Sequence, residues 1–217
     1  MLDGPRSKPA SGTARQLVVI CHGVGADGHD LIDLASYWAH ALPDAAFVAP
    51  DGPARYDMAP PDYPHARQWF SLQDRAPDKM AVGVEQARAA LDPFIDAELA
   101  RLGLPADAYA IAGFSQGAMT VLHTGLRRAT PPRAILAFSG ALLTPVPTPS
   151  PATEVLLVHG EADDVVPIQR GRDAETALLA AGMAVMAIWR PRVGHSIDEV
   201  GLSQGALLLQ RVFAAAT

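Results

Sequence analysis

A serine lies at the centre of the pentapeptide Gly113–Gly117, which reads Gly-Phe-Ser-Gln-Gly. The Gly-x-Ser-x-Gly pattern alone is weak evidence, because average residue frequencies produce it in roughly one of 3000 windows. Here an apolar run, Tyr109–Ala112, directly precedes the pattern, and helical periodicity directly follows it. A tight turn between a strand and a helix is the setting in which a serine hydroxyl is lifted out of a sheet to act as a nucleophile. The alternative is an ordinary turn in which Ser115 caps the helix.

A serine hydroxyl is a poor nucleophile until a nearby base takes its proton. His195 is the best candidate for the base, because it follows the last predicted strand and comes directly after Gly194. In hydrolases with this type of serine turn, an acid and then the histidine follow the serine along the chain. Three carboxylates, those of Glu161, Asp163 and Asp164, occupy the loop after the preceding apolar run. The residue pattern leaves all three open as the acid.

The glycine-rich segment His22–Asp27, which reads HGVGAD, follows the first apolar run. In hydrolases with a strand-turn-helix nucleophile, the loop after the corresponding strand supplies one of two backbone donors to the substrate oxyanion. We expect the N–H of Val24 to be that donor and the N–H of Gln116 to be the other. A phosphate-binding loop is the alternative, but the glycine spacing fits neither the dinucleotide-binding pattern nor the P-loop pattern.

Short apolar runs alternate with longer stretches of helical periodicity along most of the chain. The runs are continuous rather than alternating, which is typical of strands covered on both faces. They predict strands at Gln16–Cys21, Ala45–Ala49, Tyr109–Ala112, Ala134–Phe138, Val155–His159 and Ala184–Trp189. Helical spacing predicts helices at Asp30–Leu42, Met80–Leu102, Gln116–Arg128, Gln169–Ala181 and Glu199–Ala215. This alternation predicts an α/β fold, with a mostly parallel central sheet and helices on both of its faces.

Two stretches interrupt the alternation of strands and helices. Pro50–Lys79 is long, proline-rich and without a clear element, and loops of this length are usually lids, binding loops or disordered segments. Trp69 and Phe70 within it favour an ordered loop. Ser139–Thr153 contains four prolines at every second position and is typical of an extended surface connection.

The chain has 217 residues, of which 49% are hydrophobic, and this suits a single domain with a sizeable core. We expect residues 1–15 to be a disordered tail and residues 16–217 to form the domain. A net charge of −6 gives no support to a nucleic-acid partner, and no apolar run is long enough for stable membrane insertion. The single cysteine, Cys21, excludes a disulfide within the chain. With no apolar secretory segment at the N-terminus, a cytoplasmic protein is the expectation.

Four motifs together resemble the phospholipase/carboxylesterase family of α/β-hydrolases, which also contains the acyl-protein thioesterases. They are HGVGAD at 22–27, GFSQG at 113–117, HGEAD at 159–163 followed by Val166-Pro167, and Gly194-His195-Ser196. Their order and spacing match the family from about residue 16 to the C-terminus. The segment Pro50–Pro53 looks like the variant found in bacterial carboxylesterases. The resemblance implies a single-domain α/β-hydrolase fold, with Asp163 rather than Glu161 or Asp164 as the acid.

The resemblance implies a serine carboxylesterase that hydrolyses small or medium-chain carboxylic esters through Ser115, His195 and Asp163 and an acyl-enzyme intermediate. Acyl-protein thioesterase or lysophospholipase activity at the same site is the alternative, and a non-catalytic binding protein on this fold is a third hypothesis. The expected partner is a small ester, with neither a metal nor an organic cofactor. A homodimer is a further expectation from the family.

The stretch containing Trp69 and Phe70 is similar to the family's Trp-Phe segment beside the active site. Together with Met119 and Val166, these two aromatic residues form the predicted apolar lining of the substrate pocket, although each of the four also suits a core position. The chain departs from the family at Val24, where leucine is usual, and at Glu161, where aspartate is usual. The proposed role of Val24 uses only its backbone N–H, so it survives the change of side chain.

Overall fold

A computed structural model of the chain describes residues 2–148 and 152–214. Within them the main sheet has seven strands, and the strand order is β1-β3-β2-β6-β7-β8-β9. Strand β1 pairs antiparallel with β3, and every other neighbouring pair in the main sheet is parallel. The strands are β1 (Arg6–Ser7), β2 (Gln16–Cys21), β3 (Ala45–Val48), β6 (Tyr109–Phe114), β7 (Ala134–Phe138), β8 (Glu154–Gly160) and β9 (Ala184–Arg190). The predicted α/β fold, with a mostly parallel central sheet, is confirmed.

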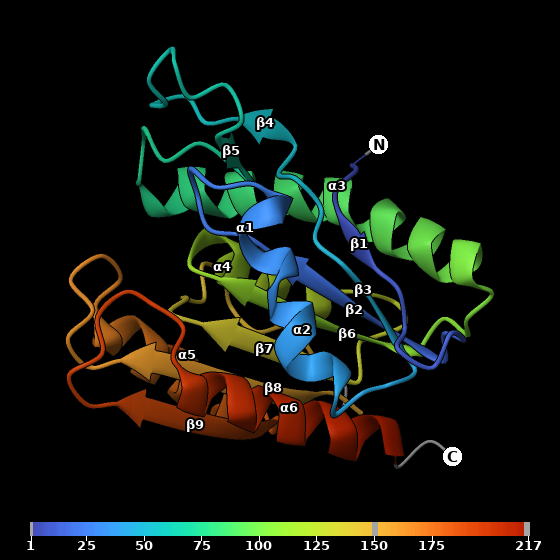
Figure 1. Cartoon of the computed structure of the whole chain (residues 1–217). Coiled ribbons are helices and arrows are strands. Elements are labelled where there is room, and N and C mark those ends of the chain that lie inside the picture. Colours follow the sequence, from blue (N-terminus) through green and yellow to red (C-terminus); the bar gives the residue numbers. More distant parts are fainter. Residues whose placement is uncertain (1, 149–151, 215–217) are drawn as a thin grey trace.

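Helices cover both faces of this sheet, as expected (Figure 1). One face packs against α3 (Pro77–Leu102), α4 (Gln116–Gly125) and α5 (Ile168–Ala180). The other packs against α1 (Gly28–Ile32), α2 (Leu34–Ala39) and α6 (Glu199–Ala214). Successive side chains of a strand point to opposite faces, so each central strand supplies both layers of the core. In β2, for example, Leu17 and Val19 pack into the first layer, whereas Val18 and Ile20 pack into the second.

The predicted strands match the structure closely, and the main differences concern helix ends. The expected helix Asp30–Leu42 is two short helices, α1 and α2, which meet at Asp33. Helix α3 begins at Pro77, before the expected Met80, because proline is well suited to the first turn of a helix. Ala215, the expected end of the last helix, lies outside the described residues, as do residues 149–151 of the proline-rich connection.

Residues 2–15 differ from the disordered tail expected from their composition. Arg6 and Ser7 form β1 and extend the sheet beside β3. The Arg6 guanidinium also binds Glu98 of α3, with its Nη2 2.6 Å from Oε1 of that buried carboxylate. A buried carboxylate requires a charged partner, and this long-range pairing holds the segment against the domain. Composition alone could not reveal it. Met1 lies outside the described residues.

The stretch Pro50–Lys79 is ordered and contains a small second sheet. Strands β4 (Ala54–Arg55) and β5 (Arg67–Gln68) pair antiparallel within it. Trp69 and Phe70 anchor the stretch, because both are buried in the core layer that α3 and α4 cover. Leu72, Arg75 and Pro77 of the same stretch line the cavity described below.

Candidate active site

The backbone of Ser115 adopts a strained conformation between β6 and α4. Its φ is +54° and its ψ is −117°, values that non-glycine residues rarely adopt. The flanking glycines have no room for a side chain: a Cβ on Gly113 would lie 2.5 Å from the backbone of Gly117, and one on Gly117 would lie 2.0 Å from the carbonyl oxygen of Cys21. The hydroxyl of Ser115 makes no capping hydrogen bond to α4. The alternative of an ordinary capping serine therefore does not fit the structure.

Ser115, His195 and Asp163 form a continuous chain of hydrogen bonds. The Nε2 of His195 lies 2.9 Å from the Oγ of Ser115, and its Nδ1 lies 2.8 Å from Oδ2 of Asp163. The three residues follow β6, β9 and β8, respectively. These strands are parallel, so their carboxyl ends meet at one edge of the sheet, on the left in Figure 1. Residues that are far apart in the sequence are thus brought together.

Asp163 is the only one of the three candidate carboxylates that contacts His195 in the described part of the chain. Its Oδ1 accepts hydrogen bonds from the backbone N–H groups of Val165 (3.0 Å) and Val166 (2.8 Å). Burial works to raise the pKa of Asp163, but the hydrogen bonds from His195 and from the two N–H groups outweigh it and hold the pKa below its usual value. Asp163 therefore stays ionised beside the imidazole at neutral pH.

The other two carboxylates of this loop point elsewhere. Glu161 is exposed and lies 3.6 Å from Arg172 of α5. Asp164 is exposed as well. The choice of Asp163 among the three thus rests on position in space, which the residue pattern alone could not supply.

A second histidine, His159, lies behind Asp163 and was not singled out by the sequence. It is buried, and its Nε2 lies 2.7 Å from the carbonyl oxygen of Val166 and 3.3 Å from Oδ2 of Asp163. A Cβ on Gly171 would lie 2.8 Å from its Nδ1, so α5 packs closely over the ring. His159 thus fixes the turn that carries the buried carboxylate. In the sequence, only its place at the end of a strand, four residues before Asp163, could have indicated this role.

The predicted oxyanion donors, the backbone N–H groups of Val24 and Gln116, both belong to residues that line the same cavity as Ser115. Neither N–H donates to an acceptor within the described residues. The Gln116 side chain bridges to the preceding loop, because its Oε1 accepts the backbone N–H of Trp69 and its Nε2 donates to the Phe70 carbonyl, each at 2.8 Å. This pair of bonds fixes the start of α4 against the preceding loop.

His22 holds the loop that carries Val24. Its Nε2 accepts the N–H of Gly52 at 2.8 Å, and its Nδ1 lies 2.7 Å from the carbonyl oxygen of Gly23. An imidazole that accepts at one nitrogen and donates at the other is neutral. Burial lowers the pKa of His22, which favours that neutral form. His22 and the side chain of Gln116 are functional contacts that the sequence analysis missed, since their partners are remote in the chain.

The cavity beside Ser115 has a volume of about 320 Å³. Met119 and Val166 line it as predicted, but Trp69 and Phe70 do not belong to its lining. Both aromatic rings lie in the core, with 2% and 4% of their surface exposed, and the Trp69 Nε1 donates to the His22 carbonyl. The prediction that they line the substrate pocket is corrected accordingly: the Trp69 ring instead supports the segment that precedes Val24, and both backbones fix the start of α4 through Gln116. The lining residues are Val24, Leu72, Arg75, Pro77, Met80, Ser115, Gln116, Met119, Ala141, Leu142, Leu143, Val165, Val166, Pro167 and Arg170.

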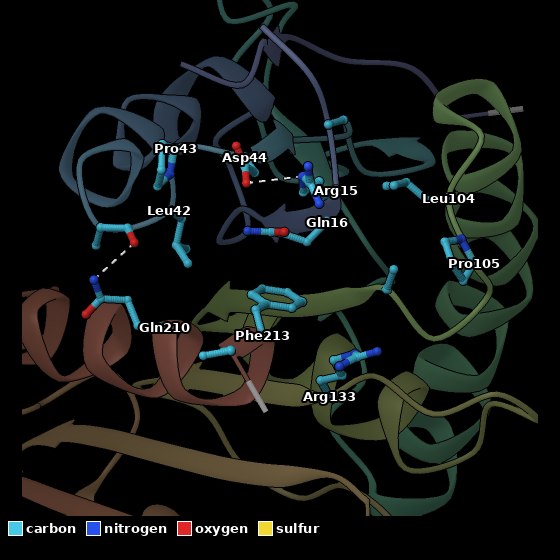
Figure 2. A pocket seen from close by; sticks show the side chains of 14 residues that line it. Arg15, Gln16, Leu42, Pro43, Asp44, Leu104, Pro105, Arg133, Gln210 and Phe213 are labelled. Atoms are coloured by element: carbon cyan, nitrogen blue, oxygen red, sulfur yellow. Dashed lines mark hydrogen bonds and ion pairs between the residues drawn. The ribbon is translucent and has the colours of Figure 1, made fainter. Parts of the chain in front are cut away.

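A second and larger cavity, of about 680 Å³, lies among residues at the beginnings of strands and the end of α6 (Figure 2). Its charged groups are paired: Arg15 lies 3.5 Å from Asp44, and Arg133 lies 2.9 Å from Asp107. None of the hydrogen-bonded residues Ser115, His195 and Asp163 lines it. Size therefore does not single out the candidate site, because Ser115 lines the smaller of the two cavities.

Metal-binding and membrane-spanning features were sought over residues 2–148 and 152–214. That part of the chain contains no group of three or more His, Cys, Asp or Glu side chains able to hold a metal ion. It also contains no helix with the length and hydropathy needed to cross a membrane.

Similarity to known proteins shows the family of the chain. The model of the phospholipase/carboxylesterase family matches residues 5–210. The chain belongs to this family. The esterase YpfH of Escherichia coli is 31% identical over 185 residues, which cover 85% of this chain and 78% of that protein. Acyl-protein thioesterase 1 of Neurospora crassa is 28% identical over 211 residues, covering 88% of this chain and 84% of that protein.

Solved structures extend the similarity to the whole fold. The crystal structure of esterase PE8 superposes with a TM-score of 0.86 at 36% identity and covers 97% of this chain and 99% of its own. A carboxylesterase of Bacillus cereus is only 14% identical but has a TM-score of 0.77, covering 98% of this chain and 95% of its own, and so supports the fold alone. This member of the phospholipase/carboxylesterase family has the α/β-hydrolase fold and is a serine hydrolase that acts on ester bonds.

Proposed function

We propose that the protein is a carboxylesterase that hydrolyses small or medium-chain carboxylic esters, with Ser115 as nucleophile, His195 as base and Asp163 as acid. The observation that carries the proposal is the hydrogen-bonded chain from the Ser115 hydroxyl to the Asp163 carboxylate, with spacings of 2.9 Å and 2.8 Å. Its position beside an apolar cavity supports an ester as the substrate. The volume of about 320 Å³ lies at the small end of the roughly 300–1000 Å³ range of ligand pockets, which favours short acyl groups.

In the first half of the proposed reaction, the Ser115 oxygen attacks the ester carbonyl while His195 Nε2 takes the hydroxyl proton. The carbonyl oxygen becomes an oxyanion, which the N–H groups of Val24 and Gln116 stabilise. The bond from carbon to the alcohol oxygen then breaks, and His195 returns its proton to the departing alcohol. Asp163 holds the imidazole in the correct tautomer and stabilises its protonated form throughout.

In the second half, water attacks the acyl-enzyme formed on Ser115. His195 takes a proton from this water, and the second oxyanion occupies the same two N–H groups. Collapse of that intermediate breaks the bond to the Ser115 oxygen, which regains its proton from His195. The carboxylic acid leaves, and the free enzyme is restored.

Replacement of the nucleophile tests the proposal. Ser115→Ala should lower the turnover of a short-chain 4-nitrophenyl ester by about 10⁴-fold or more, because covalent catalysis is lost. The circular dichroism spectrum and the thermal midpoint of the variant serve as folding controls. A folded variant with wild-type turnover would show that Ser115 is not the nucleophile.

Thioester and lysophospholipid hydrolysis by the same three residues are the alternative activities. A panel of simple esters, thioesters and lysophospholipids with matched acyl chains separates them by kcat/KM. A non-catalytic binding protein would turn over none of these substrates. A cytoplasmic location and a homodimer stay predictions, to be checked by cell fractionation and by the mass of the protein in solution.

A further inference from the structure

Two arginine side chains, Arg75 and Arg170, belong to the lining of the cavity that holds Ser115. Arg75 lies just before α3, whereas Arg170 lies in the first turn of α5. Both residues line the cavity and are exposed to solvent. A purely alkyl ester has no anionic group that two guanidinium groups could bind.

Neither guanidinium has an acidic partner in the part of the chain that the structure describes. None of the described residues that line the cavity is acidic, and neither arginine side chain has a hydrogen bond or ion pair with another described residue. The carboxylates that flank Arg75 in the sequence make other contacts. Asp74 accepts the backbone N–H of Ala76 at 2.9 Å, and Asp78 lies 3.8 Å from Lys79.

Some arginines elsewhere in the molecule are paired with acidic side chains, whereas Arg67, whose buried Nε has no hydrogen-bond partner among the described residues, is not. Arg172, two residues after Arg170 on the same helix, lies 3.6 Å from Glu161. Arg15 and Arg133 of the second cavity each lie beside an aspartate. The chain as a whole carries a net charge of −6. The cavity beside Ser115 is thus lined by two arginines without an acidic partner among the described residues, in a chain whose net charge is negative.

We propose that the substrates of this esterase carry an anionic group, which Arg75 and Arg170 bind while the apolar part of the substrate contacts Met119 and Leu143. This inference rests on the proposed function, because it names the class of ester that the site accepts. A guanidinium presents several N–H donors in a plane and binds a carboxylate more specifically than an ammonium does. The anionic group belongs to either the acyl chain or the alcohol, and the test separates the two.

Two pairs of esters provide that test. The first pair consists of 4-nitrophenyl hexanoate and the mono-4-nitrophenyl ester of adipic acid, whose acyl chains have equal carbon number and differ in a terminal carboxylate. The second pair consists of the butanoate esters of 4-hydroxybenzoic acid and of its methyl ester, which differ in a carboxylate on the leaving group. For each pair the measured quantity is the ratio of kcat/KM for the anionic ester to kcat/KM for the neutral one.

The variants are Arg75→Gln, Arg170→Gln and the double variant, which keep most of each apolar stem. In at least one pair the ratio should fall about two- to fivefold for each arginine removed, as expected for an exposed ion pair. Raising the salt concentration should lower the wild-type ratio as well, because exposed charges are screened. Arg172→Gln is the matched control, since it removes the same charge from α5 away from the cavity, and its ratio should stay at the wild-type value.

The outcomes distinguish this inference from the function on which it rests. Ratios in both pairs that the double variant leaves unchanged would overturn the inference while Ser115-dependent hydrolysis upholds the esterase. An equal fall in Arg172→Gln would also overturn it, because a general field effect would then explain the result. If the wild type hydrolysed none of the four esters, both the proposed esterase function and this inference would be overturned.

Discussion

Asp163 illustrates how a single side chain is selected by its surroundings rather than by its type. Two backbone N–H groups and the His195 imidazole all donate to this carboxylate, and together they hold its pKa below the usual value despite its burial. Glu161 and Asp164 occupy the same loop but remain exposed. Of the three carboxylates in this loop, only that of Asp163 is therefore placed to orient the His195 imidazole.

Neutralising each carboxylate in turn tests this selection. Asp163→Asn should lower kcat for a short-chain ester by about 10⁴-fold, the loss seen when the corresponding acid of a serine protease becomes an amide. Glu161→Gln and Asp164→Asn should each stay close to wild-type kcat. Steady-state kinetics of the three purified variants decide the point. An equal loss of kcat in Glu161→Gln would contradict the assignment of Asp163 as the only acid that orients His195.

The two glycines of the pentapeptide serve the strained turn through their lack of a side chain. Gly117→Ala would place a Cβ 2.0 Å from the carbonyl oxygen of Cys21, so we expect a loss of more than about 2 kcal/mol in the free energy of unfolding. Gly194→Ala is the matched control, since the nearest atom to its Cβ would be 3.9 Å away and it should cost less than about 1 kcal/mol. Urea denaturation measures both. A Gly117→Ala protein as stable as Gly194→Ala would contradict the account of this turn.

At the scale of elements, β1 and the small sheet of β4 and β5 were not predicted from the sequence. Strand β1 includes Arg6, which forms an ion pair with Glu98, a carboxylate with only 5% of its side chain exposed and with Arg101 as a second partner at 2.7 Å. Burial works to raise the pKa of Glu98, but hydrogen bonds from Arg6 and Arg101 outweigh it and lower the pKa. Arg6 thus links β1 to the Glu98 carboxylate of α3, in addition to the pairing of β1 with β3.

Arg6→Ala should therefore destabilise the protein by about 1–3 kcal/mol at neutral pH, since Arg101 keeps part of the pairing. A lowered pKa in the folded state means that the stabilisation is present above the ordinary glutamate pKa and is lost as pH falls through the folded value. The difference from wild type should shrink below about pH 4.5. Urea denaturation across pH measures it, with Lys8→Ala as the control for an exposed cation. Equal stability of the two variants at pH 7 would contradict the role of Arg6.

At the scale of the whole molecule, parallel strands gather the chemistry at one edge of the sheet. Six strands of the main sheet could be predicted because they are covered on both faces and are continuously apolar. Ser115 and His195 could be found because each follows one of these strands. Trp69 and Phe70 were misassigned because a buried aromatic residue looks the same in a sequence whether it lines a pocket or a core. The contacts of His22 and His159 depend on partners brought together only by folding.

The central claim is that Ser115 is the residue that becomes acylated. Intact-protein mass spectrometry after treatment with a fluorophosphonate, followed by peptide mapping, tests it most directly. The account predicts a single adduct on the peptide that contains Ser115, and none on Ser115→Ala. An unlabelled wild type, or an adduct on another residue that persists in Ser115→Ala, would contradict it.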